Sequence, residues 1–326
     1  MLAAVQNTVF SMRFLTLLLF AFLVSPVHAR KGPPVPDYPV DPVAEGVYVI
    51  HGPLTTPNPK NQGFMNNPAF VMTSAGVVIV DPGGSLQSGE MVLRQLKKLT
   101  DRPVVAVFNS HIHGDHWLGN QAVRAAFPKA TIYAHPKMIE MAKDGAGDDW
   151  VALLDRSAPG AADGTVPEIP DAAVDNGQVI RVGDVDFAIH HFGTMHTPTD
   201  LLISIRGGKI LFTGDNLLNG RLGRSSDGHI GKMIEASDAL VEKLDPEVVI
   251  PGHGRTGDRA MYDYAMEPFR IIYRVVKEQY ENDVSDFEMK PVVVEALKEY
   301  RSWEEFDNLV GKIVNQAYLE IEEADF

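Results

Sequence analysis

The stretch His111-Ile-His113-Gly-Asp115-His116 directly follows Val104–Phe108, a short apolar run rich in β-branched residues. The run predicts a buried strand. Two histidines at i and i+2 of an extended chain point the same way, and neutral imidazole suits zinc. Asp115 and His116 lie where a helix over residues 116–127 is predicted to begin, so the chain turns and presents two more donors. Four donors in six residues predict a metal site.

Similar apolar runs recur along the chain and predict strands, with helical patterns between them. Strands interleaved with helices imply layered α/β packing. A helix is expected after Ser88, another over 233–244, and a short one around 150–154 within a surface excursion spanning 142–176. The other expected strands are Val47–His51, Ala69–Thr73, Val77–Val80, Thr131–His135, Val185–His190, Leu201–Ile205, Lys209–Thr213 and Val248–Ile250.

Four other motifs, one before this stretch and three after it, also end apolar runs. They are Val77-Val-Ile-Val-Asp81-Pro-Gly, Gly193-Thr-Met-His196-Thr-Pro-Thr-Asp200, Phe212-Thr-Gly-Asp215 and Pro251-Gly-His253-Gly. The five motifs, in their order along the chain, resemble the metallo-β-lactamase superfamily up to about residue 257. The fold that this resemblance implies is α/β: a four-layer αβ/βα sandwich with metals at one edge, between two mixed sheets.

The resemblance also implies a ligand set. His111, His113 and His196 would hold one metal, Asp115, His116 and His253 the second, and Asp215 would bridge them. Two Zn²⁺ per chain are expected, with iron or manganese as alternatives, and a metal-bridging hydroxide would attack the substrate. Asp115 is also expected to be catalytic. Asp81 is either an acceptor that fixes a ligand histidine or a strand-end turn residue.

The absence of cysteine excludes disulfides, thiolate ligands and a cysteine nucleophile. Class B lactamases generally lack the bridging aspartate, so Asp215 favours the glyoxalase II-like branch: exported zinc hydrolases of thioesters, lactones, lactams or similar bonds. The alternatives are a mono-iron persulfide dioxygenase, a β-lactamase, and a non-catalytic metal-binding protein of a periplasmic oxidation pathway. Sequence alone leaves the metal open.

Two loops are candidates for substrate contact. The glycine-rich segment 219–232 carries four basic or titratable residues that could bind a substrate carboxylate, namely Arg221, Arg224, His229 and Lys232. Its other interpretation is a solvated loop. The long loop 54–67 holds Phe64 and Met65, either as an apolar tip over the site or as ordinary core residues. The remaining histidines outside the ligand set are expected to be structural or solvated.

The termini differ from the central part of the chain. Residues 1–29 have the basic start, apolar run and small-residue end of a signal peptide, so a periplasmic or secreted protein without stable membrane insertion is expected. Residues 30–42 form a proline-rich leader, 43–257 the superfamily domain, and 258–326 a helical extension packed on it. With 29 basic and 43 acidic residues, the chain disfavours nucleic acid and leaves a small-molecule substrate as the expected partner.

Overall fold

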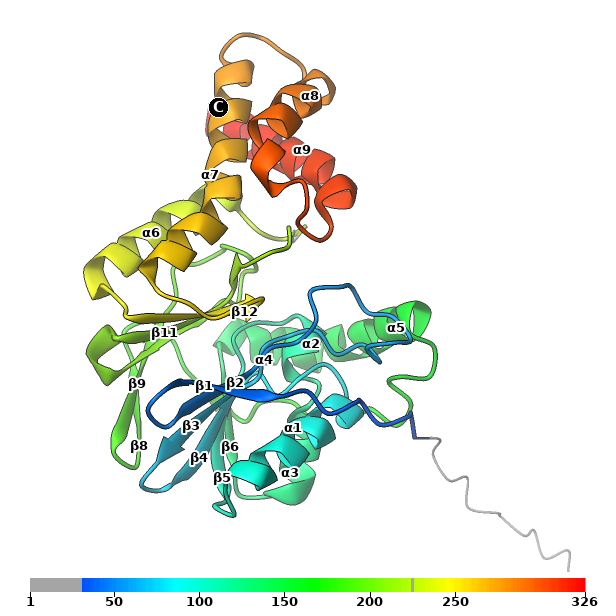
Figure 1. Ribbon diagram of the computed structural model, residues 1–326, viewed down its shortest axis with the longest axis vertical. Coiled ribbons are helices and arrows are strands. Elements are labelled where there is room, and N and C mark those ends of the chain that lie inside the picture. Colours follow the sequence, from blue (N-terminus) through cyan, green and yellow to red (C-terminus); the bar gives the residue numbers. More distant parts are fainter. Residues whose placement is uncertain (1–30, 224–225, 326) are drawn as a thin grey trace, which may run out of the picture.

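Two β-sheets face each other, and each carries helices on its outer side (Figure 1). The computed structural model describes residues 31–223 and 226–325. Strands of the first sheet follow the order β1 to β7, and the second has the order β12-β11-β10-β9-β8. The predicted four-layer α/β sandwich is confirmed.

The first sheet contains the first seven strands. They are β1 (Val40–Ala44), β2 (Val47–Ile50), β3 (Ala69–Thr73), β4 (Gly76–Val80), β5 (Val104–Phe108), β6 (Thr131–Ala134) and β7 (Ala172–Ala173). Strands β1 to β4 pair antiparallel, whereas β4 to β7 pair parallel. Helices α1 (Leu86–Leu99) and α3 (Asn120–Ala126) supply Met91, Val92, Leu96 and Val123 to the cluster on the outer face of this sheet.

The second sheet contains β8 (Val179–Val182), β9 (Val185–His190), β10 (Leu202–Ile205), β11 (Ile210–Leu218) and β12 (Val248–His253), with a short 3₁₀ turn η1 (Arg206–Gly208). Helices α6 (Ile230–Leu244) and α7 (Arg259–Tyr280) cover its outer face. Apolar side chains from both sheets form the layer between them, including the stacked rings of Phe108 and Phe187, whose centroids are 5.1 Å apart.

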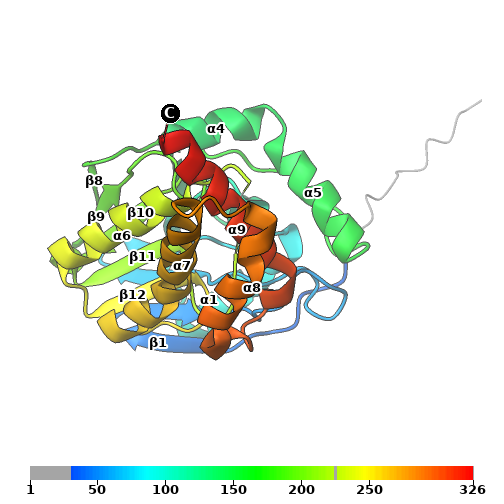
Figure 2. The ribbon, with the colours of Figure 1, turned by 90° about the horizontal axis from the view of Figure 1, so that it is seen from above.

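The remaining helices lie at the edges. Short α2 (Gly114–Trp117), α4 (Pro136–Lys143) and α5 (Ala146–Ser157) lie beside the first sheet. Beyond α7, the chain forms α8 (Asp286–Ala296), the turn η2 (Lys298–Tyr300) and α9 (Phe306–Ala324). In the view from above, α7, α8 and α9 group together over the second sheet (Figure 2). They share one apolar cluster with α6 and with Leu202, Leu211 and Val249 of that sheet.

Several predicted elements differ from the structure. The expected helix over 116–127 is interrupted, because the Gly119 amide donates to the Gly83 carbonyl at 2.7 Å instead of continuing the helix. The helix expected after Ser88 begins at Leu86, since Ser85 and Ser88 form a capping box. The proline-rich stretch 30–42 was expected to contain no element, yet β1 begins at Val40 and pairs with β2.

Other differences are extensions. The short helix expected around 150–154 is present but longer, since α5 covers twelve residues, and β7 and β8 were not predicted. Strand β11 continues past Thr213 to Leu218, so Asp215 lies within the strand and not at its end. The signal-peptide prediction falls on residues outside the described ones. In the part of the chain that the structure describes, no helix combines the length and the apolar character needed to cross a membrane.

The layer between the sheets generates a stability prediction. Phe187 is fully buried and stacked on Phe108, so Phe187→Ala leaves a cavity that should lower the free energy of unfolding by about 3–5 kcal/mol. The control is Phe287 on α8, which is 77% exposed. Phe287→Ala should change the free energy of unfolding by less than about 0.5 kcal/mol. Chemical denaturation of both variants measures this. Equal effects would contradict the packing described.

Candidate metal centre

The predicted ligands converge at one edge of the sandwich, where strands of both sheets end. His111 and His113 follow β5, and Asp115 and His116 lie in α2. The second sheet contributes three more side chains from separate segments: His196 between β9 and β10, Asp215 within β11, and His253 at the end of β12. The fold therefore gathers seven side chains that are far apart in the sequence.

These side chains form two groups. Donor atoms of His111, His113, His196 and Asp215 lie within 4.8 Å of one another, and so do those of Asp115, His116 and His253. In the first group His196 Nε2 lies 3.1 Å from His113 Nδ1. In the second, Asp115 Oδ2 lies 3.3 Å from the Nε2 atoms of both His116 and His253. Each group has the donor number and types of a metal site.

Asp215 connects the two groups. Its Oδ1 lies 3.1 Å from His116 Nε2, and its Oδ2 lies 3.3 Å from His253 Nε2 and 3.7 Å from His196 Nε2. A register shift in the β11–β12 pairing occurs at Gly214, whose φ is +53°. Such a bulge re-aims the side chain that follows it. A Cβ at Gly252 would lie 2.0 Å from Asp215 Oδ1, so only glycine fits there.

Asp81 holds the histidines in place. The Ser110 amide and hydroxyl donate to its carboxylate at 2.8 and 2.6 Å, and His116 Nδ1 donates to it at 2.9 Å. Since the Ser110 proton goes to Asp81, the hydroxyl oxygen accepts from His111 Nδ1 at 3.0 Å. His253 Nδ1 donates to the Met65 carbonyl at 2.9 Å. Each of these rings thus presents a bare Nε2 to the centre.

Several buried donor atoms of the two groups are suited to binding metal ions. His111 Nε2, His116 Nε2 and Asp215 Oδ1 are buried and have no hydrogen-bond partner among the residues that the structure describes. Buried polar atoms are normally satisfied, so lone pairs that face one another without a donor call for a cation between them. Nitrogen and carboxylate oxygen are donors that divalent zinc, iron and manganese accept. The residues present therefore fit the metals that the sequence implied.

The pKa shifts agree with this arrangement. Burial lowers the pKa of His196 to about 3 and lowers that of His111 and His113, so these imidazoles are neutral and able to bind metal. For His116, burial also acts to lower the pKa, but the carboxylates of Asp115, Asp215 and Asp81 outweigh it and raise the pKa. The second group therefore favours positive charge at its centre.

A cavity of about 140 Å³ opens onto the candidate ligands. Its other lining residues are Met65, Trp150, Leu218, Arg221, Gly223 and Leu309. Trp150 of α5 packs against His113, with ring centroids 4.9 Å apart. Sequence reasoning missed Trp150 and Leu309. Nothing in the pattern of α9 indicates that Leu309, about 200 residues from the first motif, reaches this cavity.

Only some of the four substrate-binding candidates in segment 219–232 line a cavity beside the donor groups. Arg221 lines the cavity, and Arg224 lies outside the described residues. His229 caps α6 and lies 3.2 Å from Glu320, where it lines a smaller cavity beside His196 and Asp215. Lys232 lines neither cavity. Its amide donates to the His229 ring in the first turn of α6.

The two candidates in loop 54–67, Phe64 and Met65, lie in different places. Met65 lines the cavity and its carbonyl orients His253, so this part of the loop reaches the site. Phe64 instead packs against Tyr38 in the core outside the first sheet, with ring centroids 4.8 Å apart.

A third cluster, His135, Asp175 and His191, lies at the ends of other strands. The imidazoles of His135 and His191 stack with centroids 4.1 Å apart, and burial together with His191 lowers the pKa of His135 to about 4. His135 Nδ1 accepts the Lys137 amide at the start of α4. That bond agrees with the structural role predicted for His135.

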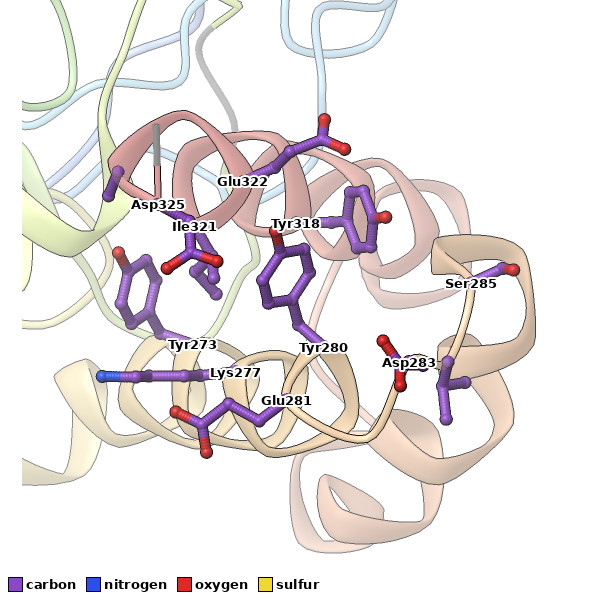
Figure 3. Close-up of a pocket in the computed structure, with 12 residues that line it drawn as sticks. Tyr273, Lys277, Tyr280, Glu281, Asp283, Ser285, Tyr318, Ile321, Glu322 and Asp325 are labelled. Carbon is purple, nitrogen blue, oxygen red and sulfur yellow. The ribbon is translucent and has the colours of Figure 1, made fainter.

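A larger cavity of about 650 Å³ lies elsewhere, between α7 and the end of α9. Figure 3 shows Tyr273, Tyr280 and Tyr318 on it, with carboxylates such as Glu281 at its rim. No histidine lines it, and none of the seven candidate ligands reaches it. The cavity of about 140 Å³, and not this larger one, therefore opens onto the candidate metal centre.

Comparison with known proteins agrees with this geometry. The family model of the metallo-beta-lactamase superfamily matches residues 62–253, which include the candidate ligands. The chain belongs to this superfamily. The resemblance inferred from the motifs is confirmed, and helices α7 to α9 lie beyond the matched region of this superfamily member.

The chain is also similar to one protein in sequence and to two solved structures in fold. It is 26% identical over 197 residues to the hydroxyacylglutathione hydrolase of Tolumonas auensis, covering 60% of this chain and 63% of that one. A metallo-beta-lactamase from Pontibacter korlensis has a TM-score of 0.57 at 19% identity, covering 71% of this chain and 98% of that one. A sec-alkylsulfatase from Pseudomonas sp. has a TM-score of 0.67 at 16% identity, covering 86% of this chain and 50% of that one.

The position of Asp215 gives a testable prediction. Asp215→Ala leaves three protein donors in each group but removes the carboxylate between them, so repulsion between two cations is no longer offset. The variant should fold normally, retain about one metal ion per chain, and lose most of its activity. Metal analysis with circular dichroism measures this, and the exposed Asp186→Ala serves as the control. Two retained ions with normal turnover would contradict the bridging role.

Proposed function

We propose that this protein is an exported, dinuclear metal-dependent hydrolase of a carbonyl-type bond, such as a thioester, lactone or lactam. The observation that carries the proposal is the contact of Asp215 with histidines of both donor groups, at 3.1 to 3.7 Å. A single carboxylate shared between two donor groups is an arrangement suited to a two-metal hydrolytic site, because its negative charge offsets the repulsion between the cations.

The roles of the residues follow from their contacts. Divalent ions held by these residues would lower the pKa of a bound water toward about 7 and so supply a nucleophile at neutral pH. Asp115 contributes an oxygen to the second group, and we assign it a hydrogen bond to the attacking water as well. Asp81 and the Met65 carbonyl orient His116 and His253. Trp150, Leu218 and Leu309 give the cavity an apolar surface beside the donor groups.

The choice of substrate class rests on the relatives. The hydroxyacylglutathione hydrolase of Tolumonas auensis supports a thioester. Turnover is measured with S-acylglutathione thioesters, lactones, β-lactams and alkyl sulfates. The class that is cleaved separates a thioesterase from a lactonase, a β-lactamase or a sulfatase. Turnover of none of them would favour a non-catalytic metal-binding protein.

An oxygenase with one iron is the second candidate, because histidine and aspartate also bind Fe(II). It needs only one of the two donor groups. The complete second group, Asp115, His116 and His253, favours the hydrolase. Oxygen consumption with a persulfide and one iron per chain would favour the oxygenase.

Export rests on the signal-like residues 1–29. We propose a periplasmic or secreted enzyme whose mature chain begins at Arg30. Expression of the full chain in a bacterium, followed by mass spectrometry of the periplasmic fraction, should find that N-terminus. A chain that remains in the cytoplasm with residues 1–29 attached would contradict export.

Metal removal tests the central proposal. Protein purified without chelator should contain about two transition-metal ions per chain, lose hydrolysis on chelation and regain it with Zn²⁺. His113→Ala should lower kcat/KM by more than about 100-fold, since even residues that only orient ligands cost 10- to 100-fold. His190→Ala, whose ring bonds Ser204, is the matched control. Full activity in metal-free protein would overturn the proposal.

A further inference from the structure

The ring of His51 contacts polar groups from two distant parts of the chain. Its Nδ1 lies 2.8 Å from Asp41 Oδ2, and its Nε2 lies 3.0 Å from the Thr256 hydroxyl and 3.2 Å from the Thr256 amide. Asp41 belongs to β1, His51 follows β2, and Thr256 lies between β12 and α7. A carboxylate, an imidazole and a hydroxyl linked in this order have the connectivity of a triad that activates a nucleophile.

The groups around His51 determine which ring nitrogen carries the proton. A carboxylate only accepts hydrogen bonds, so Nδ1 is protonated and donates to Asp41. A main-chain amide only donates, so Nε2 is bare and accepts from Thr256. The Thr256 hydroxyl therefore donates to Nε2 as well, which is the direction that general-base catalysis requires. Burial lowers the pKa of His51, although its hydrogen bond to Asp41 acts in the opposite direction, so the ring is neutral at pH 7.

The three residues connect the edges of the two sheets. Strands β1 and β12 are the edge strands of their sheets and lie at the same side of the sandwich (Figure 2). Arg255 Nη1 donates to Asp41 Oδ2 at 2.9 Å and so helps to fix the carboxylate that orients His51. The sequence predicted only a structural or solvated role for His51, because Thr256 is 205 residues away in the chain.

A cavity of about 520 Å³ opens onto all three side chains. This volume lies within the roughly 300–1,000 Å³ that is typical of small-molecule sites. Its lining also includes the apolar residues Pro42, Val43 and Val248. Among the residues that the structure describes, none lines both this cavity and the one of about 140 Å³ at the metal centre. The cavity can therefore take a ligand of its own.

We propose that Asp41, His51 and Thr256 form a second acyl-transfer site, separate from the metal centre, that accepts small activated acyl esters. Thr256 is the nucleophile, His51 is the general base, and Asp41 is the positioning residue that holds the proton of His51 on Nδ1. Pro42, Val43 and Val248 would contact a short acyl chain. The inference does not rest on the proposed metal-dependent hydrolysis.

The proposed reaction has two steps. Thr256 Oγ1 attacks the carbonyl carbon of the ester while its proton passes to His51 Nε2, and the proton then moves to the leaving oxygen as the bond from that oxygen to the carbonyl carbon breaks. In the second step water adds to the acyl group and gives a proton to Nε2. The bond to Oγ1 then breaks and Oγ1 takes up that proton, which yields the carboxylic acid and free Thr256. Water activated at the metal centre would add to a carbonyl directly, so an acyl group on Thr256 distinguishes the two sites.

Acylation of Thr256 is measured with p-nitrophenyl acetate and the protein as purified, by acid quenching over a time course followed by peptide mass spectrometry. An acetyl group should form on Thr256 and not on the exposed Thr56. Thr256→Val should remove this label, whereas Thr256→Ser keeps a hydroxyl and should still be labelled at position 256. Thr56→Val is the matched control. Native protein without an acetyl group on Thr256 at any time would overturn the proposal.

The labelling rate tests the other two residues. His51→Gln should lower the rate of acetylation at Thr256 by about 100-fold or more, because general-base catalysis contributes at least that much. His190→Gln, whose half-buried ring bonds Ser204, is the matched control. Asp41→Asn should lower the rate at least about tenfold, and Asp41→Glu should restore part of it. Metal content and the midpoint of unfolding should be unchanged. Equal labelling rates in native protein and His51→Gln would mean that Thr256 is not activated and would overturn the triad.

Discussion

The buried carboxylate of Asp215, shared among three imidazoles, is the contact on which the rest of the site depends. His116, His196 and His253 reach it from both halves of the sandwich. Two local features of the second sheet make room for it: the bulge at Gly214 and the missing side chain at Gly252. Burying this carboxylate is costly unless positive charge offsets it, so we expect bound metal ions to stabilise the packing of the two sheets at this edge.

Much of the centre could be predicted because its donors follow strands. The His111–His116 motif ends a parallel strand of the first sheet, and the motifs at His196, Asp215 and His253 lie in or beside strands of the second. The structure brings all of them together. The position of Asp215 within β11 could not be predicted, since the bulge depends on pairing with β12 and on the approach of Ser110, whose side chain lies 3.0 Å from where a Cβ at Gly214 would be. Pairing partners are not encoded in the local pattern.

Tertiary contacts explain the other differences. Lys232 and Arg221 look equivalent in the glycine-rich loop, but the helix that begins at Ile230 carries Lys232 away, whereas a parallel backbone bridge to Glu304 holds Arg221 at the cavity. Leu309 has the spacing of an ordinary core residue of α9. The superfamily region supplies the metal donors, and helices beyond it supply one side of the cavity. A shared scaffold with a different wall is one way in which related enzymes differ in substrate.

Anomalous diffraction from crystals of protein purified without added metal tests the central claim most directly. Data collected on both sides of the zinc, iron and manganese absorption edges would locate and identify each ion. The account predicts two peaks per chain, about 3.5–4 Å apart, one among His111, His113 and His196 and the other among Asp115, His116 and His253, with Asp215 between them. A single peak in a fully loaded protein, or ions bound away from Asp215, would contradict it.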